Sequence, residues 1–213
     1  MDNLDRYQSI RLTPSQTRGK ERVRRILAAS LSLFKERGVE ETTTNEIAAR
    51  AGIPIGSLYR YYPNKDAIIR VLTDLYIDDL SAIFADIAAH PLYMQYSWNE
   101  LLFMLLDTWV HYSRMNGSFA FLYAERGNPR LRSLNAASWR RFTANFTAVL
   151  RKRCADITDR EAMVCLQMAV AASELGINGG YEKELGENLH YEAVEAIAAY
   201  LQLICRRHKH DDM

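Results

Sequence analysis

The 213-residue sequence has no hydrophobic run that could cross a bilayer and few residues suited to disulfide or metal chemistry. Its longest apolar runs, such as residues 101–106, are far shorter than the roughly 20 residues of a membrane-spanning helix. Residues 1–20 mix acidic and basic side chains without the apolar core of a signal peptide, so we expect a cytoplasmic protein with no membrane partner. The three cysteines, Cys154, Cys165 and Cys205, match neither zinc nor disulfide spacing and are predicted to be buried free thiols.

Motifs of catalysis are also missing. The sequence has no phosphate-binding glycine loop, no GxSxG nucleophile turn and no HExxH zinc motif, and its five histidines are dispersed. Two of them, His208 and His210, fall in residues 208–213, which we expect to be a solvated tail. We therefore predict no catalytic residue, no metal site and no cofactor, and we expect a protein that is not an enzyme.

The charge is distributed unevenly along the chain. Residues 1–66 hold 12 Lys and Arg against 8 Asp and Glu, a net charge of +4, whereas the remaining 147 hold 15 against 18, a net charge of −3. A basic N-terminal third suits a polyanionic partner, because contacts to phosphate dominate the affinity of proteins for nucleic acid. Small domains often carry such a charge by chance. The charge alone is therefore weak evidence for a nucleic-acid partner, and other features must identify that partner.

What the sequence does have is helical periodicity. Apolar residues recur at spacings of three and four over most of its length, and no alternating pattern of useful length predicts a strand. In the first helix, which begins at about Thr17 and ends at Gly38, the apolar stripe consists of Val23, Ile26, Leu27, Leu31 and Phe34. We expect an all-α protein of about nine helices.

Two short helices around a turn are predicted next. Thr43 and Glu46 have the spacing of a capping box, in which each residue satisfies a backbone N–H of the other. Gly52 breaks this helix after about two turns, and a second short helix is predicted at Ile55–Tyr61, where Pro63 stops it. Two short helices joined by a glycine-containing turn form the helix-turn-helix pattern.

The rest of the chain is predicted to be a larger helical body. It opens with a long helix from Lys65 to Ala89, which we expect to be the only connection to the helix-turn-helix. Four further helical segments are expected at about residues 97–116, 118–153 with a break at 127–129, 159–177 and 188–207. The predicted organisation is a flexible arm, a three-helix head, the body and the tail, at residues 1–17, 18–64, 65–207 and 208–213.

The most specific pattern is TTNEIAARAGIPIGSLYRYYPNKD at residues 43–66. It combines Thr-Thr and Ile-Ala in the first short helix, Ala-Gly at the turn, Gly-Ser-Leu-Tyr in the second, and Lys-Asp at the start of the long helix. In order and spacing this resembles the signature of the TetR family of transcription regulators. The similarity is dense over residues 18–70, about a quarter of the chain, whereas the remainder resembles the family only in length and helical plan.

The resemblance implies a DNA-binding homodimer with a ligand-binding and dimerisation body. Most such regulators are repressors, so we expect release from a pseudo-palindromic operator by a small, largely hydrophobic or aromatic ligand. Activators share the fold, and the sign of regulation stays open, as do the operator sequence, the number of dimers on each operator and the identity of the ligand. A DNA-binding protein that acts without a small ligand, through a protein partner or as an architectural factor, is the alternative.

The resemblance also assigns the DNA contacts. Residues 54–56 would face the major groove, and Arg60 would reach a base or a phosphate. Ile55 stands where many relatives have a polar base reader, so it could make only apolar contact, for instance with a thymine methyl group. The residues that would hold phosphates are Thr44, Ser57, Tyr59, Tyr61 and Lys65. The full set of candidate DNA-binding residues is Thr43, Thr44, Pro54, Ile55, Gly56, Ser57, Tyr59, Arg60, Tyr61 and Lys65.

The same segment can be interpreted without the family. Leu58 would fill the centre of the head and leave the donors of Tyr59 and Arg60 on the opposite face, where they could position the protein on a duplex. Gly56 lacks a Cβ where a helix must come close to another group. The alternative is that Tyr59, Tyr61 and Tyr62 are core aromatics of an unrelated bundle. The joint order and spacing of these residues favour DNA binding.

An aromatic and Met-rich belt between residues 93 and 146 predicts an effector pocket in the body, because small-molecule pockets are mostly apolar with a few polar groups. The candidate ligand-binding residues are Trp109, Tyr112, Tyr123, Trp139, Phe142 and Met168, with His111, Asn145 and Glu174 as possible polar anchors. For any single one of these residues, an ordinary place in the core is the favoured alternative.

The last two long helices are predicted to form a dimer interface. Leu166 and Val170 lie on the first of them, and Val194, Ile197 and Leu201 form a stripe on the second. Two such helices from each subunit would make a four-helix bundle about a two-fold axis. The alternative is that these stripes are buried within one subunit.

Overall fold

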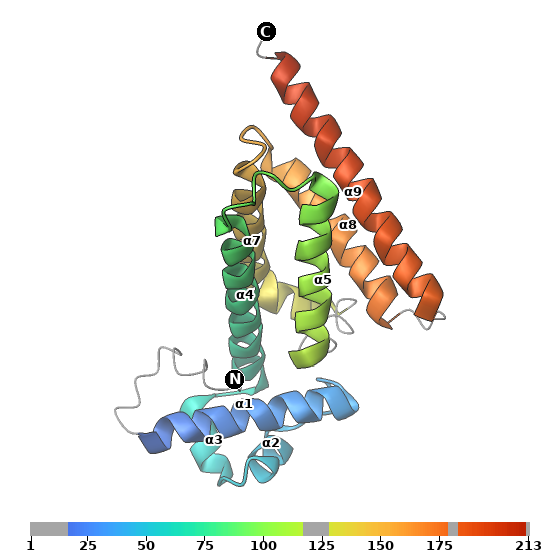
Figure 1. Ribbon diagram of the computed structural model, residues 1–213. Coiled ribbons are helices and arrows are strands. Elements are labelled where there is room, and N and C mark those ends of the chain that lie inside the picture. Colours follow the sequence, from blue (N-terminus) through green and yellow to red (C-terminus); the bar gives the residue numbers. More distant parts are fainter. Residues whose placement is uncertain (1–16, 117–127, 179–182, 212–213) are drawn as a thin grey trace. The chain divides into compact units, whose positions relative to one another are not determined.

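The computed structural model describes residues 17–116, 128–178 and 183–211, and these residues are helical with short connections (Figure 1). The helices within these ranges are α1 (Thr17–Arg37), α2 (Thr44–Arg50), α3 (Ile55–Tyr61), α4 (Lys65–Ala89), α5 (Trp98–Asn116), α7 (Pro129–Arg151), α8 (Asp159–Asn178) and α9 (Lys183–Asp211). No strand occurs in the same ranges, and the all-α prediction is confirmed. The expected arm, up to residue 16, lies outside the described residues, and α9 continues four residues past its expected end at 207.

The chain forms two compact units. The first, which we call the head unit, comprises Met1–Tyr76 with Gly117–Asn135, and the second, the body unit, comprises Ile77–Asn116 with Ala136–Met213. Because both α4 and α7 cross a unit boundary, the expectation that α4 is the only connection is wrong.

The head unit is built around the apolar stripe of α1. Its buried residues come from α1, α2, α3, the first half of α4 and the first turn of α7; they include Ile26, Leu27, Phe34, Ile47, Leu58, Ile68, Ile69, Leu72 and Leu131. Leu131 is only 4% exposed, so the start of α7 is part of the same core as the helix-turn-helix. The head core therefore extends beyond residues 18–64.

Local sequence signals set the ends of the short helices. Thr43 caps α2: its Oγ1 accepts a hydrogen bond from the Glu46 N–H, and the Thr43 N–H donates to the Glu46 carboxylate at 2.8 Å, which confirms the capping box. Gly38 and Gly52 both have positive φ, 84° and 62°, the left-handed conformation that glycine adopts without steric penalty. Each follows the end of a helix, as the sequence predicts.

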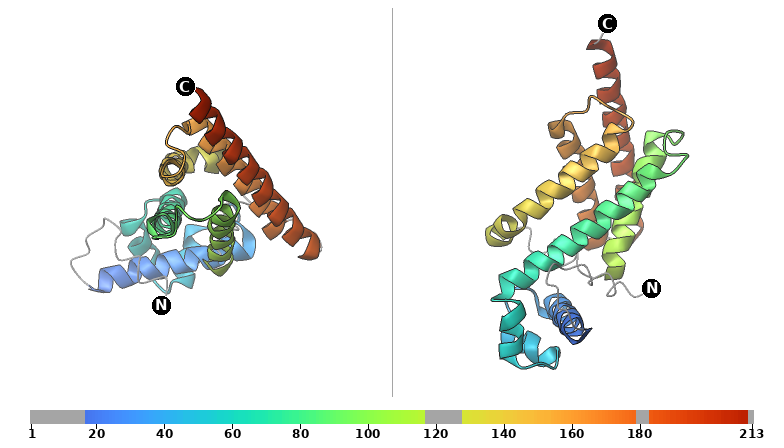
Figure 2. Two further views of the ribbon diagram at one scale, coloured as in Figure 1. Left: turned by 45° about the horizontal axis from the view of Figure 1, so that its top comes forward. Right: turned by 90° about the vertical axis from the view of Figure 1, so that its left-hand side faces the viewer.

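In the body unit, α8 and α9 pack side by side and both contact α5 (Figures 1 and 2). Phe142 of α7 lies at the centre of an aromatic cluster, with its ring centroid 5.8 Å from each of the rings of Phe84, Trp109 and Trp139. None of the described helices is apolar over a long enough stretch to span a bilayer.

The cysteines form no disulfide. Cys154 and Cys165 are buried and Cys205 is half-buried. Burial raises the pKa of the Cys165 thiol to about 12, so this thiol stays protonated and unreactive at neutral pH.

Candidate nucleic-acid interface

The turn between α2 and α3 orients the second helix of the motif. Leu58 of α3 and Ile47 of α2 are both fully buried and hold the two helices in the head core. Gly52 reverses the chain with its positive φ, and the Arg25 guanidinium of α1 donates to the Gly52 carbonyl at 3.0 Å. Pro54 then precedes α3 in an extended conformation, with φ −61° and ψ 143°. The residues of α3 that are not needed for packing are thereby directed outward.

A pair of hydroxyl groups joins the exposed sides of the two helices. The Thr44 Oγ1 at the start of α2 lies 3.0 Å from the Tyr59 Oη on α3, within hydrogen-bonding distance. Tyr59 is 49% exposed although it is a large aromatic residue. The two hydroxyls therefore present donors and acceptors at the surface, where they can contact a phosphate group.

Gly56 lies on the same side of α3 as Tyr59, because residues three apart in a helix share a face. It is exposed, and a Cβ built at this position would have no protein atom within 4 Å. Gly52 is different, since a Cβ there would come within 2.6 Å of the Arg25 Nη2 and the residue has positive φ. The protein's own packing thus explains the glycine at 52 but not the glycine at 56.

Arg60 is the exposed cation of α3. Its guanidinium carbon lies 5.3 Å from the centroid of the Tyr61 ring, and its Nη2 lies 3.5 Å from the Tyr61 Oη. Tyr61 itself is half-buried against the head core, so its ring is a fixed platform for the guanidinium. This arrangement holds Arg60 at the surface next to Tyr59.

The other predicted DNA contacts are placed less favourably. Pro54 is exposed and Ser57 is half-buried. Ile55 packs partly against the head core, and the Thr43 hydroxyl is engaged by Glu46, to which it donates at 2.8 Å. Of the three tyrosines that the alternative interpretation places in a core, Tyr62 is buried, Tyr61 is half-buried and Tyr59 is exposed.

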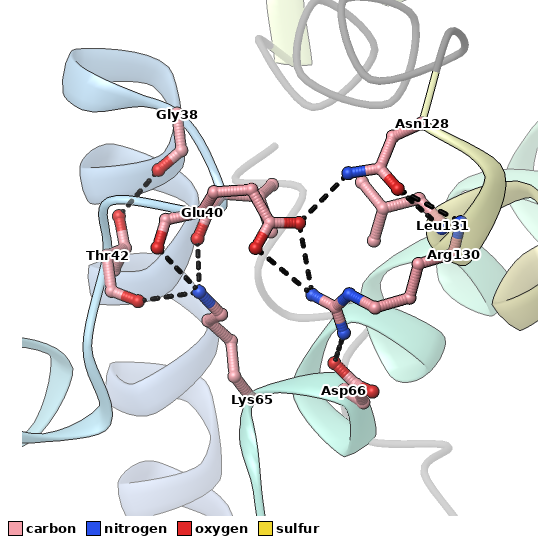
Figure 3. Close-up of polar contacts among 9 residues, drawn as sticks. Gly38, Glu40, Thr42, Lys65, Asp66, Asn128, Arg130 and Leu131 are labelled. Atoms are coloured by element: carbon pink, nitrogen blue, oxygen red, sulfur yellow. Dashed lines mark hydrogen bonds and ion pairs between the residues drawn. The ribbon is translucent and has the colours of Figure 1, made fainter.

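Lys65 is engaged within the head and does not stand free for DNA. Its ammonium group donates to three backbone carbonyls, those of Val39 at 2.5 Å, Glu40 at 3.1 Å and Thr42 at 2.9 Å (Figure 3). These contacts use all three of its donors, so the group is not available as the expected phosphate contact. Lys65 instead fixes the loop between α1 and α2 to the start of α4.

Ion pairs on the outer surface of the head were not expected from the sequence. The Glu36 carboxylate accepts from both Nη atoms of Arg50, at 2.7 and 2.9 Å, and from the Ser32 hydroxyl at 2.7 Å. The hydrogen bonds from Arg50 and then Ser32 lower the pKa of Glu36 to about 2. Arg37 and Glu46 form a second pair at 2.6 Å. Both pairs tie α1 to α2 and engage two of the basic residues of the head.

The aromatic candidates of the body are mostly core residues. Trp109 and Phe142 are buried in the aromatic cluster, at 1% and 0% exposure. Trp139 and Met168 are half-buried, and so is Tyr112, whose hydroxyl donates to Asp79 at 2.7 Å. Tyr123 and the side chain of Glu174 lie outside the described residues.

The proposed polar anchors do not line this cluster. His111 is exposed, and the exposed Asn145 donates to the Ser81 hydroxyl at 3.0 Å. The structure therefore brings Trp109, Trp139 and Phe142 together but leaves these two polar candidates at the surface.

The residues predicted for the dimer interface are buried inside one chain. All five are at most 2% exposed in the single subunit: Leu166, Val170, Val194, Ile197 and Leu201. The inner sides of α8 and α9 pack against each other and against α5, so the stripes found in the sequence are core, as the alternative interpretation held. The exposed apolar side chains of the same helices are Met163, Val164, Tyr191 and Leu203.

Comparison with known proteins agrees with this geometry. Residues 26–72 match the family model described as bacterial regulatory proteins, tetR family. The HTH-type transcriptional repressor KstR2 of Rhodococcus jostii (strain RHA1) is 36% identical over 67 residues, which are 32% of this chain and 33% of that protein. The nucleoid occlusion factor SlmA of Pasteurella multocida is 43% identical over 56 residues, 26% of this chain and 28% of that protein. The matches thus span about a third of the length of these curated relatives.

Solved structures are similar over most of the chain. A transcriptional regulator from Aquifex aeolicus VF5 has a TM-score of 0.63 at 18% identity, and covers 86% of this chain and 99% of its own. A TetR-family regulator from Streptomyces coelicolor has a TM-score of 0.65 at 22% identity with the same coverage. The fold is therefore shared well beyond the segment in which the sequences are similar. The chain thus matches the model of the tetR family at its helix-turn-helix, residues 26–72, and shares its all-helical fold with solved regulators of similar length.

Proposed function

We propose that the chain is a DNA-binding regulator of transcription that docks α2 and α3 on double-stranded operator DNA, with α3 in the major groove. The observation that carries this proposal is Gly56. Glycine is a poorer helix former than alanine, by up to about 1 kcal/mol in a helix interior, and no neighbouring atom of the protein requires a glycine at this position in the first turn of α3. A partner that approaches the backbone of α3 closely supplies the reason for it.

The residues around Gly56 suit the backbone of a duplex. The hydroxyls of Thr44 and Tyr59, 3.0 Å apart, would bind a phosphate, and Arg60 would reach a phosphate or a base edge. The head unit also carries exposed basic residues near the start of α1: Arg18, Lys20 and Arg22. Because Ile55 packs partly on the core, direct base readout by this residue is restricted, and Arg60 and the shape of the DNA carry more of the specificity.

We further propose that the protein acts as a homodimer through the outward sides of α8 and α9. Met163 and Val164 on α8 and Leu203 on α9 are large apolar side chains exposed in the single chain. A second copy would bury them in a four-helix bundle about a two-fold axis. The operator would then be pseudo-palindromic, with recognition helices about one DNA turn, roughly 34 Å, or somewhat more apart.

Repression relieved by a small, largely apolar effector in the body is the regulatory part of the proposal. KstR2, to which the chain is similar, is named a transcriptional repressor. The half-buried Tyr112, Trp139 and Met168 are better candidates for effector contacts than the fully buried Trp109 and Phe142, because they retain accessible surface.

A DNA-binding protein without a small effector is the second candidate. The observation in its favour is the close packing of aromatic rings around Phe142, which occupies the region where the sequence predicts a pocket. SlmA, another similar protein, is named a nucleoid occlusion factor and not a transcription regulator. Thermal shift with a panel of apolar ligands separates the two, since a ligand at a hundred times its Kd stabilises a protein by about 2.7 kcal/mol.

The DNA-binding proposal is tested with two arginine variants. Arg60→Gln removes the exposed cation of α3, and Arg140→Gln removes a cation of α7 in the body unit that is also exposed. We expect Arg60→Gln to weaken binding to a duplex selected by the wild-type protein and, if it contacts a phosphate, to reduce the salt slope by about one. Arg140→Gln should bind as the wild type does. Equal affinities of all three proteins would contradict the assignment of α3 to DNA.

A further inference from the structure

The start of α7 is capped by a side chain that also reaches the loop after α1 (Figure 3). The Asn128 Oδ1 accepts from the backbone N–H groups of Arg130, at 3.0 Å, and Leu131, at 3.4 Å, which makes Asn128 the N-cap of the helix. The amide nitrogen of the same side chain donates to the Glu40 carboxylate at 3.0 Å. One residue thus begins α7 and joins it to a loop 88 positions earlier in the chain.

Arg130 strengthens this connection. Its Nη2 donates to both carboxylate oxygens of Glu40, at 3.2 and 3.5 Å, and its Nη1 donates to Asp66 in the first turn of α4. The guanidinium therefore bridges two acidic side chains from different elements, with the fixed fork geometry that arginine provides. Leu131, the next residue, is buried in the head core and keeps the turn in place.

The loop between α1 and α2, which contains Glu40, leads directly into the candidate DNA interface. Lys65 binds the carbonyls of Val39, Glu40 and Thr42, and the buried Thr42 hydroxyl donates to the Gly38 carbonyl at 2.8 Å. Thr43, the N-cap of α2, follows at once. The backbone of residues 38–42 is therefore held between α7 on one side and α4 on the other.

We propose that the first turn of α7 is a positioning element for DNA binding: Asn128 and Arg130 hold Glu40 and Asp66 so that α2 and α3 meet DNA in one arrangement. This inference rests on the proposed DNA-binding function. Because α7 continues as one helix into the body unit, it is a second covalent connection between the units besides α4.

The contacts themselves indicate an effect on binding more than on stability. Glu40, Asp66 and Arg130 are 37–49% exposed in their side chains, and exposed ion pairs add little to the stability of a protein. A network that contributes little to the free energy of unfolding but joins three elements acts mainly by selecting one geometry. Its loss should therefore appear in DNA affinity at temperatures where the fold is intact.

The variant Asn128→Asp separates the hydrogen bond to Glu40 from the capping of α7. Aspartate caps a helix as well as asparagine does, but it has no amide donor for Glu40 and places a second carboxylate next to it. We expect an unchanged thermal midpoint, faster amide exchange at residues 43–47, and affinity for a selected duplex that is weaker by about two- to thirtyfold, the range found for residues that couple distant sites.

Arg130→Gln is the second variant, with Arg132→Gln as its matched control on the same exposed turn. We expect Arg130→Gln to weaken binding within the same range at an unchanged salt slope, and Arg132→Gln to bind as the wild type does. Affinity equal to wild type in both Asn128→Asp and Arg130→Gln would overturn the inference. So would a salt slope reduced by about one in Arg130→Gln, since this is the sign of a direct phosphate contact. Failure of the wild type to bind any duplex would instead contradict the proposed function.

Discussion

Replacing Gly56 with alanine should stabilise the protein and weaken its binding to DNA. A methyl group at this position meets no protein atom within 4 Å, and the backbone there has no positive φ. Alanine therefore removes the entropic penalty of glycine in α3, which is about 0.5–1 kcal/mol. For a chain of this size, 1 kcal/mol corresponds to a rise of about 2–4 °C in Tm.

The effect on binding should have the opposite sign. If the backbone of α3 lies against the floor of the major groove, the added methyl group overfills a close contact, and overfilling costs about 1–3 kcal/mol. This corresponds to an affinity roughly 5- to 150-fold weaker. Urea unfolding gives the first quantity and fluorescence anisotropy with a selected duplex gives the second. A variant that is more stable and binds DNA as the wild type does would refute the proposal that Gly56 faces the duplex.

Gly52→Ala is the matched control. At φ +62°, alanine costs about 1–2 kcal/mol, and its Cβ would also displace the Arg25 group that binds the Gly52 carbonyl. We therefore expect Gly52→Ala to lower the free energy of unfolding. Two Gly→Ala changes four residues apart should thus change stability in opposite directions, and a Gly56→Ala protein that is destabilised like Gly52→Ala would refute the reasoning from packing.

Three further predictions concern other parts of the molecule. Tyr59→Phe removes only a hydroxyl and should weaken duplex binding on the order of tenfold, the value of a hydrogen bond to a charged group; unchanged affinity would remove Tyr59 from the interface. The pKa of Glu36 is lowered from 4.5 to about 2, so the ionised carboxylate stabilises the folded protein above pH 4.5, and this stabilisation is lost as the pH falls to about 2. The difference in Tm between the wild type and Glu36→Gln should therefore vanish between pH 4.5 and about 2. A difference in Tm that stays constant over this interval would contradict the ion pair with Arg50. Leu203→Glu should give monomers by light scattering, whereas Leu92→Glu, at another exposed leucine, should not; identical molar masses would exclude this face.

The sequence predicts well what depends on neighbours in the chain. The capping box of Thr43 and Glu46, the glycine turn at Gly52 and both ends of α4 follow from residues within one or two helical turns. The burial of Leu58 follows from the same periodicity. In these cases local preference and tertiary packing agree, so the pattern alone is sufficient.

Contacts between distant parts of the chain were not predictable in the same way. The partners of Lys65 lie 23–26 positions away and those of Arg130 lie 64 and 90 positions away, and neither set has a local pattern. A family signature indicated a phosphate contact for Lys65 because it records residue types and not hydrogen bonds. Leu131, at the start of α7, is part of the head core. The spacing of apolar residues within residues 18–64 does not predict this contact.

The proposed dimer face shows a different limit of periodicity. An apolar stripe predicts that one side of a helix is buried, but it does not identify the element that covers it. Ile197 and Leu201 are covered by the helices of their own chain, and the side that remains for a partner carries Leu203 and Met163.

Selection from a random pool of duplexes shows whether the head recognises double-stranded DNA. The purified 213-residue chain is bound to the pool at moderate salt, and the bound duplexes are amplified and sequenced over several rounds. We expect enrichment of a pseudo-palindrome whose half-sites lie about 10 bp or a small multiple apart, together with loss of enrichment in Tyr59→Ala. A folded protein that enriches no sequence over the starting pool would contradict the account.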